Sequence, residues 1–301
     1  MIMHPQSKLY WHSEVSKWLR GNCPPPVLIE IAPTGFCNAS CPWCFFKDRH
    51  EGVSINADVM RAALFDMGRM GVKSINWTGG GEPTLHIKFD EFVELTNNLG
   101  IAQGLFTNGY EEIPTADMFD WIRISVTSSG LNKVVFPKVK FGVCLNQTAD
   151  MTLGFMRSVC IRARGNGASY FQVRPALMGY YLLQPRIIIP RELEEYTTDE
   201  FEVIFTQYKY QEAQKPHGYG DCYGYNFVPS IDWRGRVATC LYRSDDPEYV
   251  LGDLNMGTFK DIWASKPDKV SVDKRCQNCC KNHEINKALY AAKRMEQVDF
   301  L

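Results

Sequence analysis

Three cysteines near the start of the chain have a spacing that suits metal binding. Cys37, Cys41 and Cys44 lie in the stretch CNASCPWC with the pattern C-x3-C-x2-C. Thiolates select zinc, copper(I) or iron–sulfur clusters. A zinc site would need a fourth ligand from elsewhere, for example His50, whereas three thiolates on a four-iron cluster leave one iron open to a non-protein ligand. Both kinds of site fit this stretch alone.

A glycine run follows the three cysteines after one predicted βα unit. It lies in WTGGGEPTLH, at residues 77–86, where a strand-like segment ends. Glycine lets a backbone approach a ligand closely, and the carboxylate of Glu82 can pair with the ammonium group of a ligand. By itself the run is also compatible with a plain turn. Its position after the cysteines favours a cofactor site.

Together, the two stretches resemble the radical S-adenosylmethionine (radical SAM) superfamily, over roughly residues 25–180. The cysteines match its C-x3-C-x-Φ-C motif with Trp43 as the aromatic residue, and GGEP at residues 80–83 matches its glycine motif. The resemblance implies a [4Fe–4S] cluster whose open iron is chelated by SAM. It also implies reductive cleavage of SAM to a 5′-deoxyadenosyl radical, which abstracts a substrate hydrogen. A flavodoxin or ferredoxin would supply the electron.

The same resemblance implies roles for several polar residues. Glu82 and the backbone of Gly80 and Gly81 would hold the methionine ammonium group, and Trp43 would lie by the adenine. Arg174 can meet the methionine carboxylate through a charge-assisted hydrogen bond. The candidates for the ribose and carboxylate contacts, each of which is also compatible with an ordinary polar strand end, are Asn108, Ser125, Asn146 and Arg174.

Six strand-like segments alternate with helical patterns, which predicts βα units and a parallel sheet. In such sheets the chemistry lies at the carboxyl ends of the strands, where the cysteine loop and the glycine run fall. The fold class is therefore α/β, and the resemblance implies a partial (β/α)6, TIM-like barrel. The predicted strands are 27–32, 73–78, 102–107, 121–126, 140–145 and 168–173, and the predicted helices are 56–70, 89–100, 114–120 and 150–164.

The pattern changes after about residue 180, and we expect four parts. A charged, helix-like stretch follows the barrel, and a glycine- and aromatic-rich region then carries the remaining paired cysteines. A last helix, through Ile285 and Leu289, is expected to pack back on the barrel. The parts are an N-terminal arm at 1–26, the barrel at 27–190, a helical connector at 191–215 and a small iron–sulfur module at 216–301.

The second cysteine set has the spacing C-x17-C followed by C-x2-C, formed by Cys222, Cys240, Cys276 and Cys279. A hairpin with the turn DWRGR is predicted between the first two. Read alone, the set fits a zinc ribbon or a second cluster. The G-x4-C pattern before Cys240 and the stretch LGDLNMGTFKDIW resemble the SPASM/twitch extension of radical SAM enzymes. The spacing is similar to that of the butirosin-pathway amino-cyclitol dehydrogenase.

The resemblance implies one auxiliary [4Fe–4S] cluster of the shorter twitch type, since the later cysteines of a full SPASM set are missing. Four thiolates leave no open iron for substrate, so we expect this cluster to transfer electrons. The predicted function is a radical SAM oxidoreductase or epimerase acting on a small polar molecule such as a sugar or amino-cyclitol. An epimerase needs a hydrogen donor, for which Cys280 and then Cys144 are the candidates, although buried cysteines are usually just small apolar residues.

Two other functions remain open. The first is epimerisation, dehydrogenation or thioether crosslinking of a ribosomal peptide. Many such enzymes carry an N-terminal leader-binding domain, and the 36 residues before Cys37 are too few for one, which favours the small molecule. The second is a structural zinc protein.

Composition sets outer limits on the function. The chain has 301 residues, of which 45% are hydrophobic, and it has a net charge of −1, so it can bury a large core and has no basic surface excess. We expect neither a nucleic-acid partner nor a membrane partner. The eleven cysteines, odd in number and without a signal peptide, favour metal binding in a cytoplasmic protein.

Overall fold

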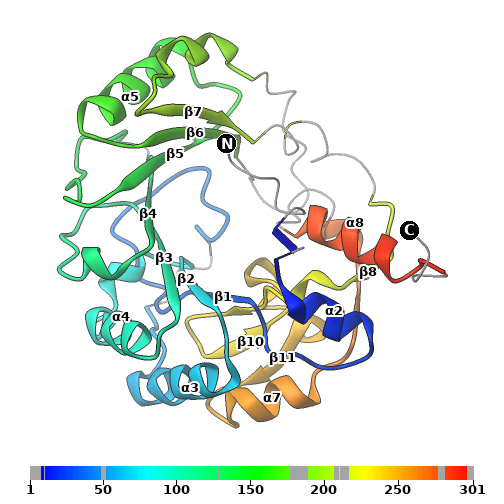
Figure 1. Ribbon diagram of the computed structural model, residues 1–301. Coiled ribbons are helices and arrows are strands. Elements are labelled where there is room, and N and C mark those ends of the chain that lie inside the picture. Colours follow the sequence, from blue (N-terminus) through cyan, green and yellow to red (C-terminus); the bar gives the residue numbers. More distant parts are fainter. Residues whose placement is uncertain are drawn as a thin grey trace.

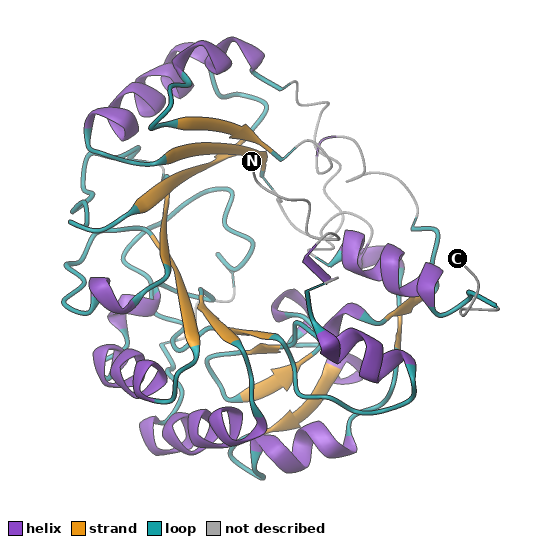
Figure 2. Cartoon of the chain, in the orientation of Figure 1, coloured by secondary structure: helices purple, strands orange, loops and turns teal. Residues whose placement is uncertain are grey.

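Seven parallel strands in consecutive order form the main sheet. The computed structural model describes residues 8–9, 11–48, 52–127, 129–176, 189–206, 210, 217–276 and 282–296. Figure 1 shows the strands bent into an open arc, and Figure 2 shows helices along its outer side. The predicted partial barrel is confirmed. Its strands are β1 (Leu28–Ile31), β2 (Ser74–Trp77), β3 (Ala102–Thr107), β4 (Trp121–Ser125), β5 (Phe141–Gln147), β6 (Tyr170–Pro175) and β7 (Glu202–Phe205).

Three helices cover the outer face of the strands: α3 (Ala57–Met70), α4 (Phe89–Asn98) and α5 (Leu153–Gly165). The first begins and ends as the sequence predicts. The Asn56 side chain accepts hydrogen bonds from the backbone of Asp58 and Val59, and Gly71 ends the helix with a φ of 83°, a conformation that glycine adopts without strain. These two capping residues therefore define where α3 begins and ends.

The two faces of the strands differ in polarity. Residues that point outward toward the helices, such as Ile29, Ile75 and Leu105, are fully buried in the main core. Residues that point into the arc are partly exposed, as in the alternating pattern of β4 and β6. They include Arg123 and Arg174. The inside of the barrel is therefore polar and open to ligands.

Residues 191–206 do not form the first part of the helical connector that the sequence analysis predicts for 191–215. They hold one 3-10 helix, Arg191–Tyr196, and then β7, which pairs in parallel with β6. FEVIF, at residues 201–205, is rich in β-branched and aromatic residues, which favour a strand, and its pairing with β6 decides the conformation. The helix predicted at 114–120 is likewise reduced to a 3-10 turn at Ala116–Met118.

The C-terminal region continues the barrel sheet instead of standing apart from it. Strand β9 (Ser230–Ile231) pairs in parallel with β1, and β10 (Arg236–Ala238) pairs with both β9 and β11 (Val250–Asp253). The sheet therefore has ten strands in the order β11-β10-β9-β1-β2-β3-β4-β5-β6-β7. The predicted hairpin is confirmed as β9–β10, with Gly235 in its turn at a φ of 89°.

Short elements complete this region. Strands β8 (Asp221–Cys222) and β12 (Val270–Ser271) form a separate antiparallel pair. Helix α7 (Phe259–Ser265) packs near α3. The remaining 3-10 helices are η1 (Pro83–Leu85), η4 (Gly224–Asn226), η5 (Leu241–Arg243), η6 (Pro247–Tyr249) and η7 (Lys274–Cys276).

The last helix, α8 (His283–Ala292), does not pack on the barrel core as predicted. Its Leu289 belongs to a second core with Tyr223 and Phe227 and with Trp18 of helix α2 (Ser13–Leu19). Figure 1 shows α8 and α2 next to each other. The N-terminal arm therefore closes over the C-terminal region. In the part of the chain that the structure describes, no helix has the length and apolar character needed to cross a membrane.

Candidate functional site

The carboxyl ends of the barrel strands surround a cavity of about 300 Å³. It lies where parallel sheets carry their chemistry. Every residue that the sequence analysis assigned to the SAM site lines it: Cys37, Cys41, Trp43, Cys44, Gly80, Gly81, Glu82, Asn108, Ser125, Asn146 and Arg174.

The three cysteine thiols of the loop after β1 share this cavity. The pKa of Cys37 is raised to about 11, mainly by burial and in smaller part by the nearby Glu82, Cys44 and Cys41. Burial also raises the pKa of Cys44. These thiols stay protonated at neutral pH until a metal displaces the protons, as expected for a metal-binding set.

The three cysteines of the loop line one cavity, and a four-iron cluster binds each of its thiolates through a separate iron. The donor set therefore fits such a cluster. His50, the alternative zinc ligand, lies outside the described residues.

Backbone hydrogen bonds join the glycine run to the residues just before the cysteine loop. Gly81 N donates to Thr34 O at 2.9 Å, and Glu82 N donates to Phe36 O at 2.7 Å. A Cβ on Gly80 would lie 2.0 Å from the ring of Trp233, and one on Gly81 would lie 1.9 Å from Phe36 O. The sequence analysis assigned these glycines to close ligand approach. In the structure, close protein packing also requires them.

Glu82 joins the glycine run to the end of β3. One carboxylate oxygen accepts hydrogen bonds from the hydroxyls of Thr107 (2.7 Å) and Thr84 (3.0 Å), and the other accepts from the backbone N–H of Asn108 (2.7 Å). The residue is 4% exposed, and burial raises the pKa of its carboxyl. A carboxylate has about four acceptor positions, so Oε2 can accept one further donor from the cavity.

The polar strand ends are organised by hydrogen bonds to one another. Asn108 donates to Asn38 Oδ1 of the cysteine loop at 2.7 Å and accepts from Tyr110 N at 2.9 Å. Arg174 Nε donates to Asn146 Oδ1 at 2.7 Å across neighbouring strands. Asn108 therefore holds the cysteine loop in place, in addition to facing the cavity.

The sequence analysis missed cavity residues that come from the C-terminal region. Leu241 and Tyr242 line the same cavity as the three cysteines. The Tyr242 ring stacks on Phe46, with centroids 5.6 Å apart, and Trp233 packs edge-on against Phe46 at 5.8 Å. No local signal marks these contacts.

Glu30 also lines the cavity, and the sequence around it could have indicated a site residue. It is a charged residue inside the otherwise apolar strand LIEI. A buried strand rarely carries such a residue without a partner or a function.

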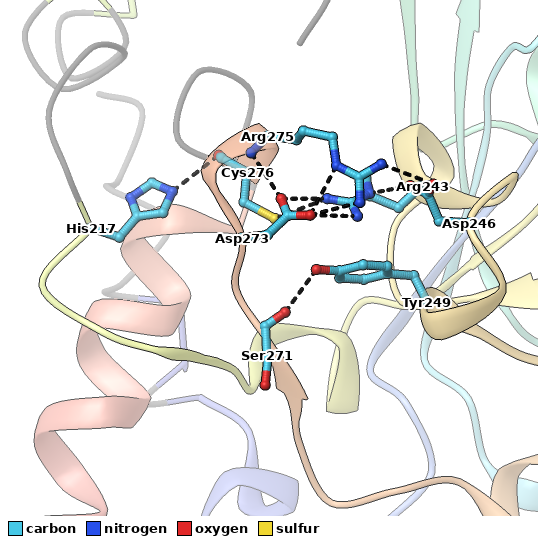
Figure 3. Close-up of polar contacts among 8 residues, drawn as sticks. All are labelled: His217, Arg243, Asp246, Tyr249, Ser271, Asp273, Arg275 and Cys276. Carbon is cyan, nitrogen blue, oxygen red and sulfur yellow. Dashed lines mark hydrogen bonds and ion pairs between the residues drawn. The ribbon is translucent and has the colours of Figure 1, made fainter. Parts of the chain in front are cut away.

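A second group of thiols lies in the C-terminal region. The pKa of Cys222 is raised to about 11, mainly by burial, and Cys240 and Cys276 are near enough to contribute to this increase. Two side-chain donors approach these sulfurs: Asn286 Nδ2 lies 3.5 Å from Cys222 Sγ, and Arg243 Nη1 lies 3.6 Å from Cys276 Sγ (Figure 3). Thiolates in iron–sulfur clusters accept such bonds, so the donor set fits a cluster.

The remaining predicted residues are less informative. Cys279 and Cys280 lie outside the described residues. Cys144 is buried in β5 and is absent from the cavity lining formed by the described residues. Its role as a hydrogen donor stays a prediction.

Comparisons with known proteins agree with this geometry. A family model described as the radical SAM superfamily matches residues 31–132, and SPASM, described as an iron–sulfur cluster-binding domain, matches residues 222–281. No curated protein matches the sequence.

Three solved structures match this chain, two of them with TM-scores above 0.5. SuiB from Streptococcus suis, solved with the precursor peptide SuiA, has a TM-score of 0.63 at 16% identity, over 89% of this chain and 72% of that one. The enzyme anSMEcpe, solved with AdoMet and a peptide, has a TM-score of 0.56 at 17% identity, over 87% and 88%. BtrN, solved with AdoMet and 2-DOIA, has a TM-score of 0.42 at 14% identity, over 87% and 88%.

The two matched domain types carry known cofactors. The first binds SAM and a [4Fe–4S] cluster, and the second binds additional iron–sulfur clusters. All seven cysteines of the two sets fall inside the matched ranges. The chain therefore carries a radical SAM domain, matched over residues 31–132, and a C-terminal SPASM-type iron–sulfur domain, matched over residues 222–281.

Proposed function

We propose that the protein oxidises or epimerises a small polar molecule, such as a sugar or an amino-cyclitol, by radical SAM chemistry. When bound, SAM and its reduced cluster supply a 5′-deoxyadenosyl radical that removes a hydrogen atom from the substrate. The proposed donor of the electron that starts this chemistry is a flavodoxin or a ferredoxin. The substrate would occupy the polar inner side of the barrel, beside the cavity.

The proposed cofactor contacts follow from the lining of the cavity. Cys37, Cys41 and Cys44 would hold the SAM-binding cluster. Oε2 of Glu82, with its one available acceptor position, would take the methionine ammonium group together with the backbone of the glycine run. Arg174, positioned by Asn146, would meet the methionine carboxylate. Trp43 would lie against the adenine, and the ribose would be held by Asn108 and Ser125.

One observation favours oxidation over epimerisation. Leu241 and Tyr242 line the cavity, and they directly follow Cys240, one of the proposed ligands of the auxiliary cluster. The polar site and the second thiol group are thus linked by consecutive residues. A substrate alcohol that has lost a hydrogen atom becomes a ketone by losing one electron and one proton. The electron would leave toward the C-terminal thiol site, and the proton would go to solvent or a nearby base.

A second candidate is modification of a ribosomal peptide. SuiB and anSMEcpe, the two compared structures with TM-scores above 0.5, were both solved with peptides bound. Their identities to this chain are 16% and 17%, so they support a shared fold, and the peptide substrate is a hypothesis for this chain. The proposed cofactor ligands and the radical chemistry in the cavity are the same for both candidate functions.

The test uses anaerobic, reconstituted enzyme with SAM, a reductant and a panel of sugars, amino-cyclitols and short peptides. We expect 5′-deoxyadenosine and a two-electron-oxidised product in equal amounts with a sugar-like compound. The Cys276→Ala/Cys279→Ala variant should still form 5′-deoxyadenosine but not the oxidised product.

Other outcomes select the alternatives. Solvent deuterium at a carbon of an otherwise unchanged product would establish epimerisation. Turnover with peptides alone would replace the small-molecule proposal. An oxidised product at the wild-type rate in the double variant would remove the auxiliary site from the reaction.

A further inference from the structure

A buried arginine lies beside one of the auxiliary thiols. Arg243 is 2% exposed, and its Nη1 lies 3.6 Å from Cys276 Sγ. The backbone carbonyl of Cys276 is held separately by Nε2 of His217, at 3.0 Å. Figure 3 shows both contacts around the same cysteine. The sulfur and the guanidinium group are therefore held in a defined position.

Two carboxylates fix the guanidinium group. Asp273 accepts from Nη1 at 2.8 Å and from Nη2 at 2.9 Å, which is the two-point geometry typical of arginine. Asp246 accepts from Nε. The Tyr249 ring lies 3.7 Å from Cζ of Arg243 and covers one face of the group. These contacts direct the Nη1 atom toward the sulfur.

A second arginine balances the charge of the group. Arg275 donates to Asp273 at 2.7 Å and to Asp246 at 3.0 Å, so two arginines meet two aspartates and the net charge is zero. The effect on Cys276 therefore depends on which charged group lies nearest to its sulfur. Among the described side chains, Arg243 is the one with a hydrogen bond to that sulfur.

We propose that Arg243 raises the reduction potential of the auxiliary cluster through its bond to Cys276. Reduction adds one negative charge to a cluster and its thiolates. A nearby N–H group with a positive charge stabilises that state more than the oxidised one. Arg243 is a positioning residue that acts through the thiolate and makes the cluster a better acceptor for a substrate electron. The inference rests on Cys276 being a ligand, as in the proposed function.

The test compares two substitutions that remove the same charge from the same network. Arg243→Gln and Arg275→Gln are made in full-length protein that also carries Cys37→Ala, Cys41→Ala and Cys44→Ala, so that only the auxiliary cluster remains. Redox titration followed by electron paramagnetic resonance measures the midpoint potential. At a given potential, we expect Arg243→Gln to raise the oxidised-to-reduced ratio at least tenfold, equivalent to a shift of about 59 mV for one electron. Arg275→Gln should change it much less.

Equal shifts in the two variants, or no shift in Arg243→Gln, would overturn the role of Arg243. If Arg243→Gln assembles no cluster, a second measurement on protein that keeps Arg243 tests the same contact. Protein labelled with guanidino-¹⁵N arginine should show a nitrogen coupling to the reduced auxiliary cluster, and the coupling should persist in Arg275→Gln. Absence of that coupling would also overturn the proposal.

Iron analysis separates this inference from the proposed function. About four irons in the parent with the three alanines, together with an unchanged potential in Arg243→Gln, would reject the role of Arg243 alone. No iron in that parent would reject the auxiliary ligand set, and the role of Arg243 with it.

Discussion

At the scale of single residues, Glu82 has both a structural and a proposed binding role. Its carboxylate joins the glycine run to Thr107 and Asn108 at the end of β3. Its Oε2 is also the proposed acceptor for the SAM ammonium group. A substitution that keeps the shape of the side chain can separate the two roles.

We expect Glu82→Gln to weaken SAM binding about 10- to 100-fold, because a hydrogen bond to a charged group contributes about 1.5–3 kcal/mol. The amide oxygen can still accept from Asn108 N, and the threonine hydroxyls can rotate to accept from the amide nitrogen. The weaker hydrogen bond from the Thr84 backbone N–H to Oε1, at 3.4 Å, is lost. Equilibrium binding of SAM to the anaerobic, cluster-loaded protein measures the effect. Glu91→Gln, the same change on an exposed helix position, is the control. Unchanged SAM affinity in Glu82→Gln would contradict the assignment.

The buried carboxyl also predicts a pH dependence of stability in the metal-free protein. Burial raises the pKa of Glu82 in the folded state. A carboxyl with a raised folded pKa destabilises the protein at higher pH, and this is relieved as the pH falls through that pKa. The free energy of unfolding of Glu82→Gln relative to wild type should therefore be highest at alkaline pH and fall progressively as the pH is lowered. Urea unfolding at a series of pH values tests it, and a constant difference between the two proteins would refute it.

At the scale of elements, the β9–β10 turn supports the cofactor site from outside the barrel. Trp233 of this turn is fully buried and packs on Gly80 of the glycine run and on Phe46 after the cysteine loop. The glycine run and the segment after the cysteine loop therefore both pack against this one side chain of the C-terminal domain. This explains why the glycine run tolerates no Cβ at Gly80.

Trp233→Ala should lower the free energy of unfolding by about 3–5 kcal/mol, the usual cost of truncating a buried tryptophan. It should also weaken SAM binding, since both the cysteine loop and the glycine run lose their support. Trp11→Ala is the matched control, because Trp11 is 79% exposed and should change neither quantity. Chemical denaturation and SAM binding give the two readouts. A destabilised Trp233→Ala protein with normal SAM affinity would show that the turn does not support the site.

At the scale of the whole molecule, one sheet runs through both iron–sulfur domains. The pairing of β1 with β9 and the aromatic contacts of Trp233 and Tyr242 with the cysteine loop make the two domains one packed unit. Ile231, Val237 and Leu254 of the C-terminal region also belong to the main core of the barrel, which favours cooperative unfolding of the two domains.

The metal-free protein should therefore unfold in a single calorimetric transition. The calorimetric enthalpy should equal the van't Hoff enthalpy, which is the test for two-state behaviour. Two resolved transitions, one for each domain, would contradict the continuous sheet as a source of cooperativity. Trp233→Ala weakens the interface and is the variant in which a second transition would first become visible.

Metal content is also a property of the whole chain. Two four-iron clusters require about eight irons per chain after anaerobic reconstitution. Cys276→Ala/Cys279→Ala should reduce this to about four. Four irons in both proteins would mean that the C-terminal cysteines hold no iron–sulfur cluster, and the proposed electron acceptor would be lost.

Much of the fold could be predicted from local patterns. Strands β1 to β6 and helices α3, α4 and α5 lie where apolar periodicity and capping residues place them, because those signals lie within a few neighbouring residues. Strand β7 was missed because the acidic residues before FEVIF favour a helix. Its pairing with β6 decides the conformation.

For the site and for the whole molecule, too, local sequence signals determined some features and tertiary contacts decided the others. The spacing of Cys37, Cys41 and Cys44 and the GGEP stretch carried the family resemblance that implied the cofactor chemistry, since ligand spacing and glycine content are properties of short segments. Only the tertiary structure could place Tyr242 in the cavity, Trp233 on Gly80 and Arg243 beside Cys276. These contacts join segments far apart in the chain, and they form only when the C-terminal strands extend the barrel sheet and pack into its main core.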